Sequence, residues 1–175
     1  MHKKAVVFVL VSFVLGALVG VAFAKKTFDT GLYHDKSAEE AGANLLRQAE
    51  AFAENGSWEN LAVARVYYLG GNKAEGQRLI DKVMGKKVEK SDWMRIGRIY
   101  HEAGEWDKAV DAFTKAIAKD PEDGHKVNEV GAYFLLRGDR EQAERYFDQG
   151  FAAEPADVWT TVAAAAAYLG VSPQH

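Results

Sequence analysis

Hydrophobic residues recur at helical spacing along most of the chain, beginning near Ser37. Ser37-Ala-Glu-Glu40 has the Ser-x-x-Glu spacing of a helix start, where the two side chains satisfy free backbone amides. Apolar residues then follow at Ala41, Leu45, Ala49 and Phe52. This spacing predicts a helix over residues 37–56, ended by Asn55-Gly56. No alternating run typical of a strand follows, so we predict an all-α fold.

The rest of the chain repeats one pattern three times. Aromatic residues stand 33, 34 and 34 positions apart, at Tyr67, Tyr100, Phe134 and Tyr168. A small residue comes three positions before each of them, at Ala64, Gly97, Gly131 and Ala165. A glycine comes four positions after the first three, at Gly71, Gly104 and Gly138. A period of this length predicts a stack of helix pairs, in which each pair buries its apolar face against the next.

Each class of repeated residue has a physical reason. Two antiparallel helices can cross closely only where side chains are small, and we expect Gly97 to face Ala109 at such a crossing. Gly104 lies where the first helix of its pair must end, and glycine tolerates the left-handed backbone needed there. Pro121 and Pro155 follow the second helices, which they prevent from continuing.

The central unit, residues 90–123, resembles the tetratricopeptide repeat. It contains Trp93-x-x-Ile96-Gly97-x-x-Tyr100, then Ala109-x-x-x-Phe113, then Pro121. Residues 124–157 keep most of this pattern, and residues 57–89 form a degenerate first unit. The resemblance implies a right-handed superhelix, an α-solenoid of about three helix pairs with a concave inner face. Residues 37–56 and 158–170 are expected to be capping helices, the second with Asp157 as its N-cap, which makes eight helices in all.

The N-terminal segment has the pattern of an export signal. His2-Lys3-Lys4 precedes an apolar run that closes on Ala22-Phe23-Ala24, which is typical of a signal peptide over residues 1–24. An uncleaved anchor is the alternative, because about 20 apolar residues can span a bilayer. Residues 25–36 are expected to be a linker. Either form predicts an exported protein, periplasmic or anchored in the inner membrane and facing the periplasm.

Composition and motifs narrow the possible functions. The chain has no cysteine, and its formal net charge of −3 with interspersed signs gives no basic face for nucleic acid. Nucleophile-elbow and phosphate-loop spacings are absent, and the histidines never share metal-ligand spacing. We therefore predict a protein that is not an enzyme, with no catalytic residues, no metal and no cofactor. His101 beside Glu102 and Glu105 is expected to be a surface cluster rather than an acid–base site.

Recognition of another protein remains as the expected function. Arg65 and Arg98 occupy equivalent positions one repeat apart, on first helices that should line the concave face. The resemblance implies that basic and asparagine residues at such positions grip a carboxylate, and arginine can do so with two parallel hydrogen bonds. The alternative is that both arginines simply pair with neighbouring glutamates. The candidate partner-binding residues are Leu61, Arg65, Tyr68, Met94, Arg98, His101, Asn128 and Leu135.

Two functions are compatible with these predictions. The first is a scaffold or assembly factor of the cell envelope that holds a partner peptide, C-terminus or helix in the concave groove. In that case, replacing Arg65 and Arg98 with alanine should weaken capture and leave thermal unfolding nearly unchanged. The second is a structural, self-assembling protein whose alanine-rich segment, Ala163–Ala167, lets another helix approach closely. Membrane contact is expected only through residues 1–24, if they are not cleaved.

Overall fold

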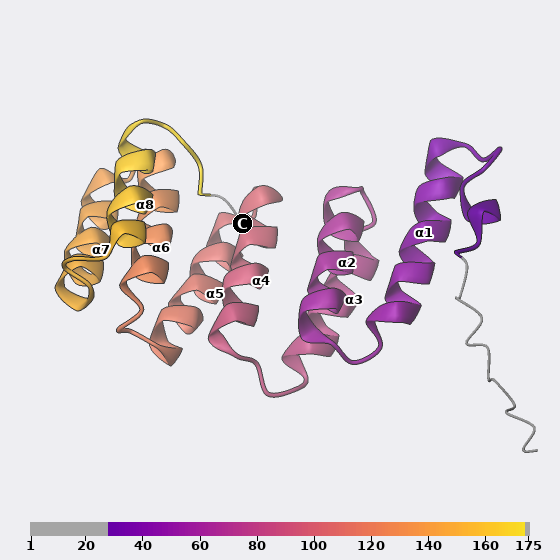
Figure 1. Ribbon diagram of the computed structural model, residues 1–175, viewed down its shortest axis with the longest axis horizontal. Helices are drawn as coiled ribbons and strands as arrows, with labels where there is room; N and C mark the ends of the chain where they lie inside the picture. The colour runs from indigo at the N-terminus through magenta and orange to yellow at the C-terminus, as the bar shows by residue number, and fades with distance from the viewer. Residues whose placement is uncertain (1–27, 174–175) are drawn as a thin grey trace, which may run out of the picture.

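The computed structural model describes residues 28–173, which form eight α-helices and one short 3-10 turn (Figure 1). In chain order these are η1 (Thr30–Leu32), α1 (Ala38–Ala53), α2 (Ser57–Leu69), α3 (Lys73–Met84), α4 (Lys90–Glu102), α5 (Trp106–Lys119), α6 (Gly124–Leu136), α7 (Arg140–Ala153) and α8 (Val158–Tyr168). The described residues contain no strand. The predicted all-α fold with eight helices is confirmed.

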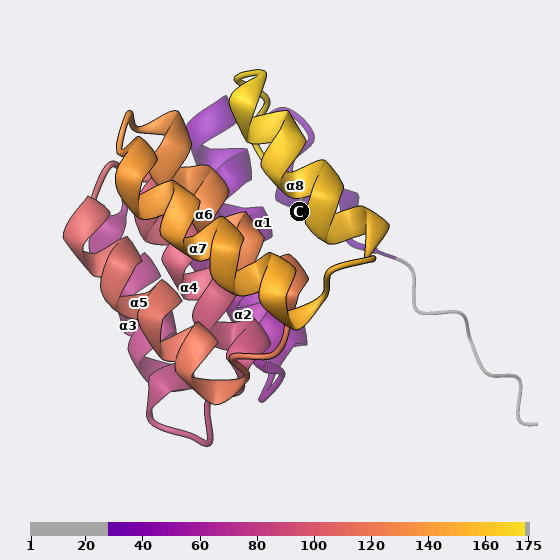
Figure 2. The ribbon, with the colours of Figure 1, turned by 90° about the vertical axis from the view of Figure 1, so that its left-hand side faces the viewer.

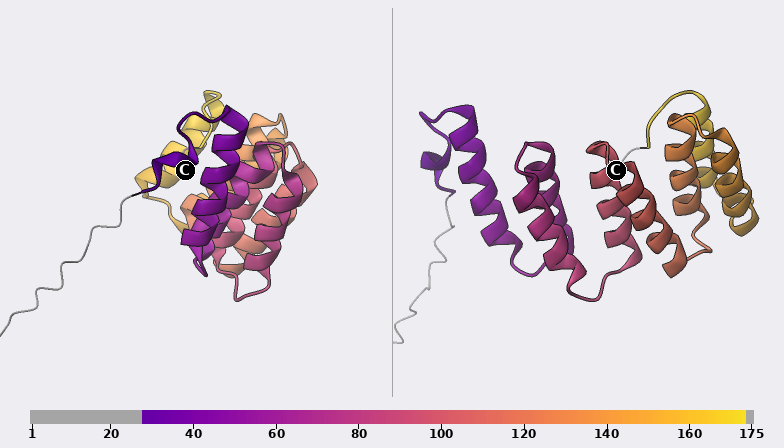
Figure 3. Two further views of the ribbon diagram at one scale, coloured as in Figure 1. Left: turned by 90° about the vertical axis from the view of Figure 1, so that its right-hand side faces the viewer. Right: turned by 180° about the vertical axis from the view of Figure 1, so that it is seen from behind.

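The helices form a row of pairs, which is an α-solenoid. The pairs α2/α3, α4/α5 and α6/α7 stand side by side along the long axis, with α1 at one end and α8 packed on the α6/α7 pair at the other (Figures 1 and 3). Three-residue connections join the helices of each pair, which makes them antiparallel neighbours. Seen from the α8 end, the pairs lie behind one another (Figure 2).

The turns inside the pairs depend on glycine. Gly71, Gly104 and Gly138 have φ angles of 98°, 76° and 88°, in the left-handed region that other residues adopt at a cost. The amide after each of these glycines returns to a carbonyl of the preceding helix, as Glu105 N does to Tyr100 O at 2.8 Å. The role predicted for Gly104 from its position is therefore confirmed.

The close crossings inside the pairs also depend on glycine, with one correction to the expected contact. A Cβ placed on Gly97 would lie 2.4 Å from the Phe113 ring, so the glycine makes room for that ring rather than for Ala109 alone. Gly131 faces Phe147 in the same way, with a closest approach of 2.8 Å. The repeated small residue and the repeated phenylalanine are thus two sides of one contact, because the ring fills the space that a side chain would occupy.

The expected helix starts are present at both ends of the solenoid. Ser37 Oγ accepts a hydrogen bond from Glu40 N at 3.1 Å and begins α1. Asp157 Oδ1 accepts from Thr160 N at 2.7 Å and begins α8. The reciprocal carboxylate contact of a capping box occurs at α4 instead, where Asp92 Oδ2 accepts from Glu89 N at 3.1 Å.

The N-terminal predictions concern residues that the structure mostly does not cover. The proposed signal peptide or anchor, residues 1–24, lies outside the described residues, as does the start of the linker at 25–36. The described part of that linker contains η1, which attaches to α1 where Asn44 Nδ2 donates to Leu32 O at 3.0 Å. Among residues 28–173, no helix is both long and apolar enough to cross a membrane.

Candidate functional site

A groove of about 770 Å³ runs between the first helices of the first two pairs, α2 and α4. Its lining combines apolar side chains with three guanidinium groups and one carboxylate. The lining residues are Leu61, Ala62, Arg65, Val66, Arg95, Arg98, Ile99, Glu102 and Pro173. The first eight come from α2 and α4, and Pro173 comes from the segment that follows α8. A groove with such a mixed lining can hold a segment of another molecule.

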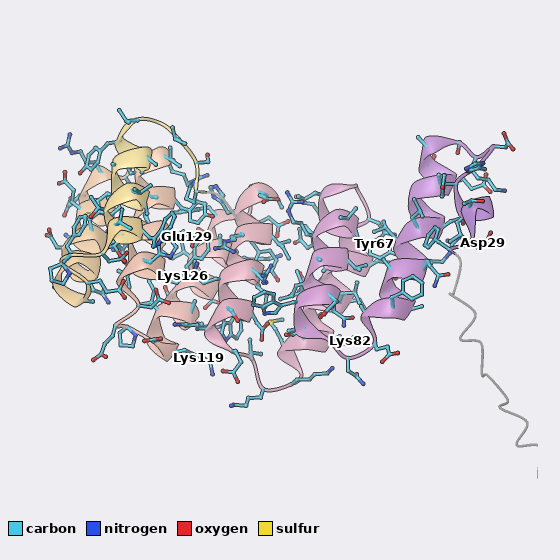
Figure 4. All side chains as sticks on the ribbon, in the orientation of Figure 1. Asp29, Tyr67, Lys82, Lys119, Lys126 and Glu129 are labelled. Atoms are coloured by element: carbon cyan, nitrogen blue, oxygen red, sulfur yellow. The ribbon has the colours of Figure 1, made fainter. Side chains whose placement is uncertain are left out.

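Arg98 forms a buried ion pair with Glu129 across the α4–α6 interface. Its Nε donates to Glu129 Oε1 at 2.7 Å and its Nη2 to Oε2 at 2.8 Å, in the bidentate geometry of a strong pair. The side chains are only 12% and 3% exposed. Lys126 Nζ adds a second cation 3.1 Å from the same carboxylate, and Figure 4 shows Lys126 and Glu129 next to each other on α6. Burial raises the pKa of Glu129, but Arg98 and Lys126 outweigh it and hold that pKa below its ordinary value.

Arg65 forms the corresponding contact at a much more solvent-exposed position. Its Nε donates to Glu102 Oε2 at 2.7 Å, and half of the Arg65 side chain is exposed. Both predicted arginines therefore pair with glutamates, which was the alternative to partner binding. The pairing engages Arg98 fully, because both partners are buried, whereas the exposed Arg65 keeps donor groups that face the groove.

Arg95 is the groove cation that the sequence reasoning missed. Its guanidinium carbon lies 3.8 Å above the centre of the Trp58 ring, which is half exposed. Among residues 28–173, no carboxylate forms an ion pair with Arg95. Burial lowers the pKa of Arg95, the nearby charge of Arg98 lowers it further, and Asp92 partly opposes both. The positive charge is thus poorly compensated, and an arriving anion would stabilise it.

A signal for Arg95 was available in the sequence. Arg95 and Arg98 are three residues apart on one helix, so they share a face. The comparison of equivalent repeat positions hid this signal, because the first unit has Ala62 where the second has Arg95. Trp58 was harder to find from the repeat, since the second and third units have Ser91 and His125 at its position and only α8 has a tryptophan there, Trp159.

Several predicted groove residues lie in the core instead. Met94 is 1% exposed, and Tyr68 is buried with its hydroxyl donating to Glu105 Oε2 at 2.8 Å. Leu61 borders the groove but exposes almost none of its surface, and Leu135 is partly buried against the core. These side chains fill space between neighbouring pairs, which is why they are apolar on a face that looked solvent-accessible from the sequence.

Asn128 also lies in the core, between α6 and α8. It is fully buried, and its Nδ2 donates to Thr160 O at 3.0 Å. A Cβ on Gly150 would come within 2.0 Å of Asn128 Oδ1, so that glycine leaves room for the amide. The asparagine thus fixes α8 on α6 and does not face the groove, which corrects its predicted place.

His101 is packed between aromatic rings. Its ring centre lies 4.6 Å from that of Tyr133 and 5.8 Å from that of Trp106. Glu105 lies outside α4, at the start of α5, and accepts hydrogen bonds from Tyr68, Lys73 and Lys108. In the described part of the chain, no three histidine and carboxylate side chains are grouped to hold a metal ion.

This chain resembles known proteins in its repeat, in its sequence and in its fold. A family model described as tetratricopeptide repeat matches residues 91–123. The human Protein O-mannosyl-transferase TMTC1 is 23% identical over 121 residues, which is 69% of this chain but only 13% of that protein. The crystal structure of MamA superposes with a TM-score of 0.52 at 16% identity, over 75% of this chain and 80% of that one. The likeness to MamA concerns the fold, and the transferase named in the human relative is far longer than this chain.

Proposed function

Because this chain is a tetratricopeptide repeat protein, we propose that it is a scaffold that binds an acidic segment of a partner protein in the groove between α2 and α4. Tetratricopeptide repeat proteins in general bind other proteins, and that general role applies to this chain. The acidic character of the partner and its place in the groove are the specific parts of the proposal.

Arg95 is the observation that carries the proposal. The Arg95 guanidinium is stacked on an exposed tryptophan and has no ion-pair partner among residues 28–173, so its donors are oriented before any ligand arrives. A partner carboxylate would gain a charge-assisted hydrogen bond there and would not have to displace an existing one. Arg65, half exposed on the opposite wall, offers a second cation at the same groove.

The apolar lining indicates what surrounds that carboxylate. Val66 is half exposed, and Ala62 is exposed beside it on α2. A segment that alternates acidic and apolar residues would place one set on Arg95 and the other on these side chains. Such a partner is held by surface complementarity, and we propose no catalytic step for this protein.

We also propose that the protein is exported and acts in the cell envelope. This part is based on the sequence of residues 1–24 alone. Measuring the mass of the protein isolated from the cells that produce it would test the cleavage: loss of residues 1–24 indicates a signal peptide, and the full mass indicates an anchor.

Photocrosslinking from inside the groove tests the binding proposal. With p-benzoylphenylalanine at Ala62, the full chain should capture a partner segment rich in Asp and Glu, and the same probe at the exposed Ala118 of α5 should not. Arg95→Ala should lower the yield about tenfold or more, since a charge-assisted hydrogen bond contributes about 1.5–3 kcal/mol.

The matched control is Arg145→Ala, because Arg145 is an exposed arginine on α7 far from the groove. Neither variant should change the melting temperature much, since an exposed cation–π contact contributes only about 0.5–1 kcal/mol. Capture that is equally efficient with Arg95→Ala, or a captured segment without acidic residues, would contradict the proposal.

A further inference from the structure

Helix α8 is the first helix of a pair whose second helix is absent from the described residues. Thirty-four positions separate Val127, Gly131 and Phe134 of α6 from Thr161, Ala165 and Tyr168 of α8. On α6 these residues are all buried, whereas their α8 equivalents are all exposed, although the Tyr168 ring still contacts Phe147 and Arg140 of α7. Seen from this end, no described helix lies in front of α8 (Figure 2). Thr161 and Ala165 therefore lie on a face of α8 that no helix among residues 28–173 covers.

Helix α1 is the reverse case, a second helix without its first. Its segment Gly42-x-x-Leu45-Leu46-x-x-Ala49 matches Gly76-x-x-Leu79-Ile80-x-x-Val83 of α3 at a distance of 34 residues. The described residues that precede α1 form the η1 turn and loop rather than a helix. By register, α1 is thus the second helix of an incomplete pair.

Among residues 28–173, no helix fills the partner position of α1. A Cβ on Gly76 would meet three atoms of α2 within 3 Å, but a Cβ on Gly42 would meet nothing within 4 Å. Leu79 is fully buried, whereas its equivalent Leu45 is 37% exposed, and Phe52 further along the same face is 66% exposed. The η1 turn attaches through Asn44 and leaves this face uncovered.

The exposed face of α8 is not the polar surface that ends a solenoid. Terminal repeats normally present a polar outer face, because an apolar one associates with other molecules. Here, α8 carries no charged residue, and its exposed side chains include several large apolar ones. These are Val158, Trp159, Val162 and Tyr168, followed by Leu169 and Val171 after the helix. The end of the described solenoid has the composition of an interface.

We propose that α8 of one copy pairs with α1 of a second copy, so that the two complete one repeat unit between them. Both halves of the missing pair are present on this chain, in the same 34-residue register, at opposite ends of the solenoid (Figure 1). Each half has an open crossing residue, Ala165 on α8 and Gly42 on α1. A second copy therefore supplies a helix that already has the spacing the first copy needs.

The contact joins two different surfaces, so it repeats from copy to copy. Each molecule that uses its α8 still has a free α1, and each that uses its α1 still has a free α8. Such head-to-tail contacts give a ring if the rotation closes and an open filament if it does not. This inference does not depend on what binds in the α2–α4 groove.

Disulfide crosslinking between copies tests the pairing, because the chain has no cysteine of its own. In the complete first unit, a Cβ on Gly76 would lie 2.9 Å from Ala64 O, so the equivalent pair Gly42 and Ala165 should come within disulfide reach. Oxidising a mixture of a tagged Ala165→Cys full chain and an untagged Gly42→Cys full chain should give mixed dimers. The double variant should give a ladder of higher oligomers.

Two controls keep the test specific. In the first control, Ala118→Cys at an exposed position of α5 is used in place of either Ala165→Cys or Gly42→Cys, and the mixed dimer should disappear. Thr161→Arg on the open face of α8 should abolish the ladder, whereas Thr114→Arg on exposed α5 should leave it intact. Neither arginine variant should unfold the protein, since both threonines are exposed.

Three results would overturn the proposal. The first is a mixed dimer no more abundant than with Ala118→Cys. The second is a dominant Ala165→Cys homodimer, which would indicate a symmetric contact between two α8 helices. The third is a ladder that survives Thr161→Arg, which would place the association elsewhere, for example in residues 1–27.

Discussion

The central pair of the solenoid and the helices at its edges use equivalent residues for different purposes. Arg98 in the centre is 12% exposed and bound to a buried glutamate, whereas its equivalent Arg65 on α2 is 50% exposed. Gly97 in the centre touches a phenylalanine ring, whereas its equivalent on α8, Ala165, is exposed. The same repeat position supports the fold where helices lie on both sides and is available for binding where one neighbour is absent.

The difference shows why a repeat alone does not identify a binding site. Each repeat position has a fixed direction relative to its own helix, but burial depends on which neighbours are present. The same substitution at two positions one repeat apart can therefore change the free energy of unfolding by amounts that differ by several kcal/mol. The comparison between centre and edge can be tested with pairs of identical substitutions.

The arginine pair should give the largest difference. Arg98→Ala leaves Glu129 buried without its bidentate partner, and it should lower the free energy of unfolding by about 3 kcal/mol, the lower end for a broken buried pair because Lys126 remains. Arg65→Ala removes an exposed pair and should cost below about 1 kcal/mol. Urea unfolding of each single variant measures both values.

This prediction corrects the expectation that replacing both arginines would leave unfolding nearly unchanged. The buried Glu129 makes Arg98 a structural residue, so loss of partner capture in Arg98→Ala would partly reflect loss of the fold. Replacing Glu129 as well should recover part of the lost stability, because the uncompensated charge is removed. Equal destabilisation by Arg98→Ala and Arg65→Ala would show that the difference in burial has no energetic consequence.

The small residues at the helix crossings should give a smaller difference. Gly97→Leu forces a side chain into the space of the Phe113 ring and should destabilise the protein by about 1–3 kcal/mol. Ala165→Leu adds the same bulk to an open face and should change thermal unfolding by no more than about 0.5 kcal/mol. Thermal unfolding of each single variant measures this difference.

The smallest effect concerns the acid sensitivity of the contact between the first two pairs. Hydrogen bonds from Lys108, Lys73 and Tyr68 lower the pKa of Glu105 from 4.5 to about 2. Since the folded pKa is the lower one, this contact stabilises the protein fully above pH 4.5. Its contribution is lost as the pH falls from 4.5 toward 2.

Melting temperatures across that pH range should therefore fall less steeply in Glu105→Gln than in the unchanged protein. The difference should correspond to below about 1 kcal/mol, because Lys73 and Lys108 are largely exposed. Glu122→Gln, in the exposed loop between α5 and α6, is the matched control and should leave the slope unchanged. An identical slope for Glu105→Gln would show that its ion pairs contribute nothing to folding.

The helices, their order and their turns could be predicted from the amino-acid sequence. The 33- to 34-residue period and the positions of Gly104 and Asp157 depend on local backbone requirements, which each residue meets through its own chemistry. Such local requirements can be predicted without knowing which helices pack nearby, and for that reason these predictions agree with the structure. The expected start at Ser37 has the same basis.

Which of the equivalent residues are buried depends on how the units pack against one another. Met94, Tyr68 and Asn128 were expected in the groove and lie in the core, while Arg95 lies in the groove on Trp58. Burial depends on contacts between residues about 30 or more positions apart, such as Arg98 with Glu129. A repeat defines a position within one unit, and the packing of neighbouring units then determines whether the side chain at that position meets protein or water.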